Sequence, residues 1–120
     1  MREAIRRELD ELLRAVDAMI LPVAPCEAPL IATGASRVNG KDVVFGSGLA
    51  MRQVINVAGV PAVAVPIGFG AAGLPLSMQI VGPAWSEAGT LRVAHAYEVA
   101  TPEIRRRRPT AITSLPAPAH

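Results

Sequence analysis

Cysteine, lysine and aromatic residues are scarce in this sequence. Its single cysteine, Cys26, excludes an intrachain disulfide and cannot assemble a thiolate metal site. Because Cys26 lies in a proline-rich loop and His95 is far along the chain, we interpret it as a small apolar residue rather than a nucleophile. The aromatic residues are Phe45, Phe69, Trp85 and Tyr97. A core would therefore be built mainly from alanine, valine, leucine and isoleucine.

Long hydrophobic runs are also missing, although 51% of the residues are hydrophobic. The longest apolar run, residues 57–70, is interrupted by Pro61 and Pro66. It is shorter than the roughly 20 residues that a helix needs to cross a bilayer. Residues 1–18 are dense in arginine, glutamate and aspartate, unlike a secretory signal peptide. The sequence therefore predicts a soluble, cytoplasmic protein with no membrane partner.

The small positive net charge, +2, comes from one place. Removing the four arginines Arg105–Arg108 from the twelve basic residues leaves eight, against ten acidic ones. Four adjacent arginines can contact phosphates, but the sequence shows neither interleaved aromatic residues nor a basic surface behind them. We expect weak, salt-sensitive affinity for polyanions and no specific recognition of nucleic acid.

Three segments have apolar residues at the spacing that is typical of helices. They cover residues 2–19, about 48–58 and about 86–100. Ser47 fits the N-cap of the second segment, and Gly59 fits its C-terminal end. The sequence therefore predicts about three helices.

The remaining parts of the chain are predicted from turn residues and composition. Residues 17–22 lead into a short strand, and residues 23–44 have the composition of a loop. Within that loop, Asn39-Gly40 is flanked by valines and predicts a tight hairpin. We predict one folded domain over residues 1–104 and a disordered basic, proline- and alanine-rich tail over residues 105–120.

The centre of the sequence predicts a hairpin. Two uncharged apolar runs, Val60–Ile67 and Leu76–Val81, are separated by a glycine-rich turn. The first run lacks polar alternation, which favours a strand covered on both faces. Pro61 and Pro66 instead favour the edge of a sheet, so we predict a short strand, Ala62–Val65, between the two prolines.

This stretch also resembles a known family. The residues that carry the resemblance, in order, are Asn56, Ala58-Gly59, Pro61-Ala62, Val65-Pro66, Gly68, Gly73-Leu74-Pro75, Gln79-Ile80 and Gly82. Together they resemble the C-terminal part of amidase-signature hydrolases, and the resemblance extends over roughly residues 3–104. It implies an α/β fold, in which a mixed sheet lies between layers of helices and the hairpin supplies strands. The family usually has a threonine before the proline that ends the first strand, whereas Leu21 stands there in this chain.

Such enzymes hydrolyse carboxamides with a serine nucleophile, a second serine and a lysine. A neutral hydroxyl must lose its proton to a base as it attacks, and backbone N–H groups must stabilise the oxyanion. The serines of this chain are all single: Ser36, Ser47, Ser77, Ser86 and Ser114. We interpret the only lysine, Lys41, as a solvated turn residue. The resemblance therefore implies an amidase fragment that lacks the Ser-Ser-Lys triad, with no catalytic residue and no cofactor.

Another catalytic set would have to include His95, which has Glu98 three residues later on a predicted helix. One histidine and one carboxylate are too few for a metal site, so we predict none.

Four residues of the hairpin are candidates for lining a pocket, and three of them, Val63, Val65 and Gln79, are the predicted substrate contacts. Val63 and Val65 are candidates for apolar contact, and Gln79 and Ser77 lie on one face of the second strand. The alternative is that these polar groups bind neighbouring backbone inside the sheet.

Three hypotheses remain open. The chain is an inert amidase fragment, a non-catalytic subunit that completes a partner carrying the triad, or an oligomerising or binding module derived from an amidase. The expected partners are an N-terminal amidase portion or a second copy. A small carboxamide would bind only if the site were completed.

Overall fold

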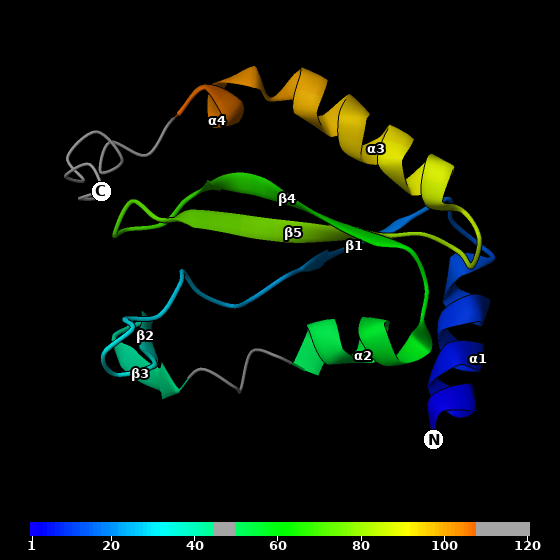
Figure 1. The fold of residues 1–120 in the computed structure, drawn as a ribbon, viewed down its shortest axis with the longest axis horizontal. Coiled ribbons are helices and arrows are strands. Elements are labelled where there is room, and N and C mark those ends of the chain that lie inside the picture. Colours follow the sequence, from blue (N-terminus) through cyan, green and yellow to red (C-terminus); the bar gives the residue numbers. More distant parts are fainter. Residues whose placement is uncertain (45–49, 108–120) are drawn as a thin grey trace, which may run out of the picture.

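The computed structural model describes residues 1–44 and 50–107. In chain order the elements are α1 (Arg2–Leu13), β1 (Met19–Pro22), β2 (Ala35–Val38), β3 (Lys41–Val44), α2 (Ala50–Ala58), β4 (Ala62–Phe69), β5 (Pro75–Val81), α3 (Glu87–Ala100) and α4 (Pro102–Arg106) (Figure 1). The predicted α/β class is confirmed. Ser47, the predicted N-cap of α2, lies outside the described residues.

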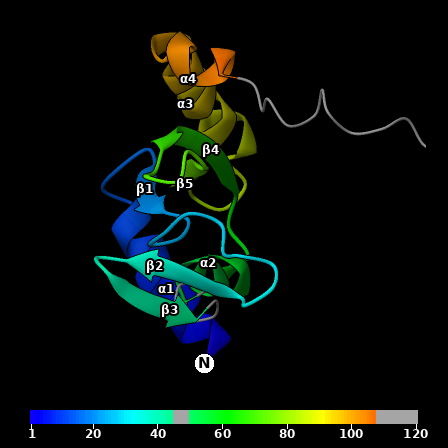
Figure 2. The same ribbon diagram turned by 90° about the vertical axis from the view of Figure 1, so that its left-hand side faces the viewer.

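The centre of the fold is a three-stranded antiparallel sheet with the order β1-β5-β4. The predicted central hairpin is confirmed, because β4 and β5 pair directly, with Val63 opposite Ile80. Figure 2 shows α3 and α4 on one side of this sheet and α2 on the other. The small hairpin β2–β3 forms a second sheet on the α2 side.

Strand β4 is longer than predicted. It continues through Pro66 to Phe69, with an irregularity in the register between Pro66 and Gly68. The prediction of a strand confined to Ala62–Val65 is therefore wrong.

The position of β4 explains why Pro66 does not end it. β4 is an edge strand. Gly82 donates its backbone N–H to the Pro61 carbonyl oxygen at 3.0 Å, so the backbone groups of Pro61 point toward β5. Because these groups alternate along a strand, those of Pro66 point toward the free edge. The missing N–H of Pro66 therefore costs no hydrogen bond within the sheet.

Helix α1 is shorter than the predicted segment 2–19. It ends at Leu13, with Leu9 and Leu13 buried. Val16 is 48% exposed, so continuing the helix would bury little more apolar surface. Met19, the first residue of β1, packs against the apolar cluster that contains Leu9 and Leu13. Met19 thus reaches the core from a strand and not from a continued helix. The helix prediction for residues 14–19 is wrong.

The tight turn at Asn39-Gly40 is confirmed and joins β2 to β3. Both turn residues have positive φ, 50° at Asn39 and 77° at Gly40. A two-residue hairpin of type I′ requires this geometry, and asparagine and glycine adopt it at the lowest cost. The small hairpin predicted within the loop-like residues 23–44 is confirmed, because the residues on both sides of this turn pair as antiparallel strands.

The ends of the other helices also follow the sequence. α2 ends before Gly59, whose φ of 70° a residue with a β-carbon rarely adopts. α3 runs to Ala100 as predicted. The additional helix α4 was not predicted, and it continues to Arg106, past the expected end of the folded part at residue 104. Proline is favourable in the first turn of α4, where its missing N–H has no partner within the helix.

Two apolar clusters hold the layers together. One joins α1 and α2 to the end of the sheet through Leu9, Leu13, Ile55, Ala58, Val60 and Val81. The other lies under α3 and contains Val65, Ile80 and Ala94. Of the described helices, none combines the length and the apolar character that crossing a membrane requires.

Candidate functional site

The three predicted substrate-contact residues do not share a face of the sheet. Val63 and Val65 face α3 and belong to the cluster under that helix, where Val65 is 6% exposed. Gln79 lies opposite Ala64, one position away from Val65, and so faces the other side. Within this chain, one pocket wall could therefore include the two valines or Gln79, but not all three.

The side chain of Gln79 is buried, with 5% of its surface exposed. Its amide nitrogen donates to the carbonyl oxygen of Pro22 at 3.4 Å. This contact agrees with the alternative considered for Gln79, in which a buried polar group bonds to backbone inside the sheet.

The other residues considered for chemistry are dispersed. His95 and Glu98 are exposed on α3, Lys41 is exposed at the start of β3, and Cys26 is half-buried. Over residues 1–44 and 50–107, no three histidine, cysteine, aspartate or glutamate residues come close enough together to hold a metal ion.

One cavity of about 610 Å³ lies between the proline-rich loop, the β2–β3 hairpin and the turn that joins β4 to β5. It is lined by Glu27, Ala28, Leu30, Thr33, Ala35, Ser36, Asp42, Ala71, Ala72 and Leu74. The two acidic residues give it a negative character, and its lining residues include no histidine or lysine that could serve as a base.

Glu27 has a definite structural task in this cavity. Its carboxylate accepts hydrogen bonds from the backbone N–H groups of Ala72, at 3.2 Å, and Leu74, at 3.0 Å. A β-carbon at Gly70 would overlap the Glu27 side chain, so a larger residue there would have to displace that side chain. The carboxylate therefore ties the loop after β1 to the β4–β5 turn. This contact was not predicted from the sequence, because Ala72 and Leu74 lie 45 and 47 residues after Glu27 in the chain.

Replacing Glu27 by alanine should lower the free energy of unfolding by about 1 to 2 kcal/mol, since two backbone N–H groups lose a charged acceptor. Urea denaturation followed by circular dichroism would measure the change. Glu11→Ala is the control, because Glu11 is exposed on α1 and its removal should change stability by less than about 0.5 kcal/mol. An equal loss in both variants would contradict the role assigned to Glu27.

A second cavity, about 360 Å³, lies where α1, the α2–β4 connection and the start of α3 meet. Trp85 is at its rim, is 89% exposed and has a φ of 65°. Positive φ is unusual for such a bulky residue. Arg6 and Glu87 also line this cavity, so both signs of charge are present.

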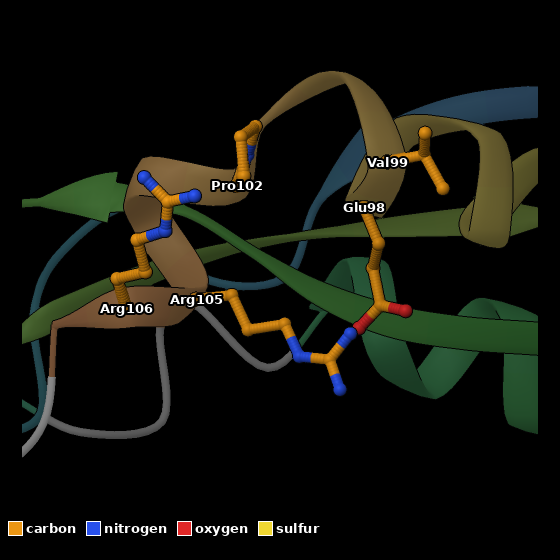
Figure 3. A pocket seen from close by; sticks show the side chains of 5 residues that line it. All are labelled: Glu98, Val99, Pro102, Arg105 and Arg106. Carbon is orange, nitrogen blue, oxygen red and sulfur yellow. The ribbon is translucent and has the colours of Figure 1, made fainter.

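A third cavity, about 500 Å³, lies at the junction of α3 and α4 (Figure 3). α3 contributes Glu98 and Val99, and α4 contributes Pro102, Arg105 and Arg106. Glu98 and Arg105 point toward one another across it. The break between the helices shapes this site, and Thr101 stabilises the break by donating its hydroxyl to the Tyr97 carbonyl oxygen at 2.8 Å. Two guanidinium groups suit the binding of an anion, and no lining residue is a nucleophile.

Comparison with known proteins identifies the family. The family model described as Amidase matches residues 1–91, from α1 into α3. The chain belongs to the amidase family. The predicted resemblance to amidase-signature hydrolases is thereby confirmed.

Individual amidase relatives extend the likeness beyond residue 91. A glutamyl-tRNA(Gln) amidotransferase subunit of Synechococcus sp. (strain CC9902) is 36% identical over 111 residues, which is 92% of this chain and 22% of the relative. Fatty acid amide hydrolase of Medicago truncatula is 36% identical over 109 residues, 89% of this chain and 18% of the relative. A solved amidase structure superposes with a TM-score of 0.74 at 30% identity, over 82% of this chain and 23% of that one.

The chain thus spans about a fifth of the length of the amidases that it matches. The described fold corresponds to one part of the amidase architecture: an antiparallel sheet with helices on both sides.

Proposed function

We propose that this chain is a C-terminal scaffold of a cytoplasmic amidase-family hydrolase and that it hydrolyses no amide on its own. The observation that carries the proposal is the family match over residues 1–91 in a sequence that contains no two adjacent serines. A serine-based amidase needs a nucleophile, a base and oxyanion donors at one place. Such a set would have to be completed by residues outside this sequence.

In this proposal the reaction is the hydrolysis of a small carboxamide through an acyl-serine, which releases ammonia or an amine and a carboxylic acid. The contribution of this chain is the β4–β5 hairpin and, as possible pocket wall, Val63 and Val65 or Gln79. Gln79 is supported as a pocket-wall residue by its place on the face of the sheet opposite α3. After a small movement, its amide would be able to hydrogen-bond a polar substrate. The two valines would need α3 to shift, because they pack beneath it.

A second candidate function is that of a non-catalytic subunit or a binding module. Exposed large apolar side chains favour it, since such surfaces are typical of interfaces. A partner is also reasonable because one relative is named as a subunit of an amidotransferase. The partner would carry the Ser-Ser-Lys set.

The first test is an ammonia-release assay on simple carboxamides with the purified chain, for which we expect no activity above buffer. Ammonia release that one serine substitution in this chain abolishes would refute the proposal.

A chimaera tests the scaffold role directly. In an active amidase of known structure, residues 1–104 of this chain would replace the corresponding segment. We expect the chimaera to fold and to hydrolyse its amide, and the same chimaera with Val65→Asp to lose both, because a charge would be buried in the cluster under α3. A chimaera that folds as well as its parent but is inactive would support the binding-module alternative instead.

A further inference from the structure

The arginine run forms a local basic cluster at the end of the described chain. Arg105 and Arg106 occupy the last turn of α4 and are exposed, and Arg107 follows them directly. In the sequence the run continues with Arg108. Outside the run, acidic residues outnumber basic ones by ten to eight. The match to the amidase family model ends at residue 91, before α4, so that match assigns this cluster no role.

The fold places an aromatic ring beside this cluster. The guanidinium carbon of Arg107 lies 3.9 Å from the centroid of the Phe69 ring at the end of β4. A β-carbon at Gly73 would lie 3.3 Å from the same guanidinium group, so the β4–β5 turn also approaches it closely. The sequence has no aromatic residue among the arginines, and the fold supplies one from a distant part of the chain.

Such an arrangement has a specific chemical use. A guanidinium group is planar, and one that rests on an aromatic ring keeps its other face free for a second planar group. Sites for single-stranded nucleic acid combine cations that contact phosphates with planar groups on which bases stack. Sequence preference is not required, because every base has a flat face.

We propose that Arg105, Arg106 and the Phe69–Arg107 stack bind single-stranded nucleic acid without sequence preference. The first two arginines contact phosphates, and a base stacks on the outer face of Arg107. An anionic membrane would use the charges alone and would leave the stack without a role. This activity is separate from amide hydrolysis and does not depend on the proposed function.

Glu98 opposes this binding. It lines the cavity that Arg105 and Arg106 also line, and it points toward Arg105 (Figure 3). Its negative charge repels phosphate and competes for Arg105. Replacing Glu98 by glutamine should therefore raise the affinity severalfold, an effect that partial unfolding of a variant would not produce.

The test uses the whole chain and a fluorescent oligothymidylate of about 20 nucleotides, with anisotropy measured at several salt concentrations. The double variant Arg105→Gln/Arg106→Gln should bind roughly tenfold more weakly or worse, with a salt slope reduced by about 1.4, or about 0.7 for each lost contact. The matched control is Arg7→Gln/Arg14→Gln, which removes two exposed arginines from the region of α1. This control should change affinity by less than about twofold.

A second comparison isolates the stack. Arg107→Lys keeps the charge but removes the planar group, so it should weaken binding of the oligothymidylate and leave binding of heparin, which has no bases, unchanged. Equal losses for both polyanions, or none for either, would overturn the stacking proposal. Equal weakening by the α1 control, or tighter binding to phosphatidylserine vesicles than to the oligonucleotide, would overturn the nucleic-acid site itself.

Discussion

Replacing Ile80 by alanine is expected to lower the free energy of unfolding by about 2 to 5 kcal/mol. Ile80 is fully buried near the C-terminal end of β5, the central strand of the sheet, and belongs to the cluster under α3. The substitution removes three carbon atoms and leaves a cavity that strands on both sides can fill only in part. Small domains are stable by only about 5 to 15 kcal/mol, so this loss is a large fraction of the total.

Urea denaturation at one fixed protein concentration would measure the loss. Ile31→Ala is the matched control, because Ile31 is 104% exposed and the same atoms are removed from water rather than from a core. We expect the control to change stability by less than about 0.5 kcal/mol. Similar effects at the two positions would mean that the sheet is not the core of the fold.

The central hairpin could be predicted because local signals and burial agree there. Two uncharged apolar runs with a glycine-rich turn between them favour paired strands that are covered by other elements. β5 extends from Pro75 to Val81, one residue longer than the predicted run. The tight turn at Asn39-Gly40 was equally predictable, since its geometry depends on those two residues.

The errors have a common physical cause, which is tertiary context. The end of α1 depends on where the helix stops meeting the core, and the apolar spacing near Met19 suits a helix or a strand. Pro66 remains in β4 because of the free edge, and strand order is not visible in the sequence.

The candidate sites were less predictable than the fold. The contact of Glu27 with the β4–β5 turn and the contact of Arg107 with Phe69 each join residues that are far apart in the chain. Side chains alternate between the two faces along a strand. Once the register of β4 and β5 is known, this alternation places Val63 and Val65 on one face and Gln79 on the other. Their role in substrate contact remains a proposal.

The isolated chain is expected to self-associate, because much of its apolar surface stays uncovered. Among the ten valine, leucine, isoleucine and methionine side chains of residues 57–81, only those of Val60, Val65, Ile80 and Val81 are buried. Val57, Ile67 and Leu74 are each at least 40% exposed. Burying one such side chain fully contributes ~1.5 to 3 kcal/mol. Contact with a second protein surface would therefore stabilise the chain substantially by burying the side chains that are still exposed.

The free edge of β1 is the place where association should begin. Val23 donates its backbone N–H to the Ser77 carbonyl oxygen at 3.1 Å, so every second residue of β1 points toward β5. The backbone groups of Ile20 therefore point away from the sheet, and its side chain is 58% exposed. On the opposite edge, Pro66 offers no N–H to a second strand. An open edge beside apolar side chains templates the addition of another strand.

Sedimentation velocity over a range of concentrations, with binding of a dye specific for apolar surface, tests this expectation. Ile20→Lys should raise the concentration needed for association roughly tenfold or more, because a lysine on an edge strand opposes pairing with another chain. Leu12→Lys is the matched control: Leu12 is 61% exposed, nearly as much as Ile20 at 58%, but lies on helix α1 and not on an edge strand. We expect a smaller effect there, since charge alone changes while the edge remains open. A chain that stays monomeric at all concentrations and binds no dye would contradict this expectation. Such a result would mean that the exposed apolar side chains do not drive association.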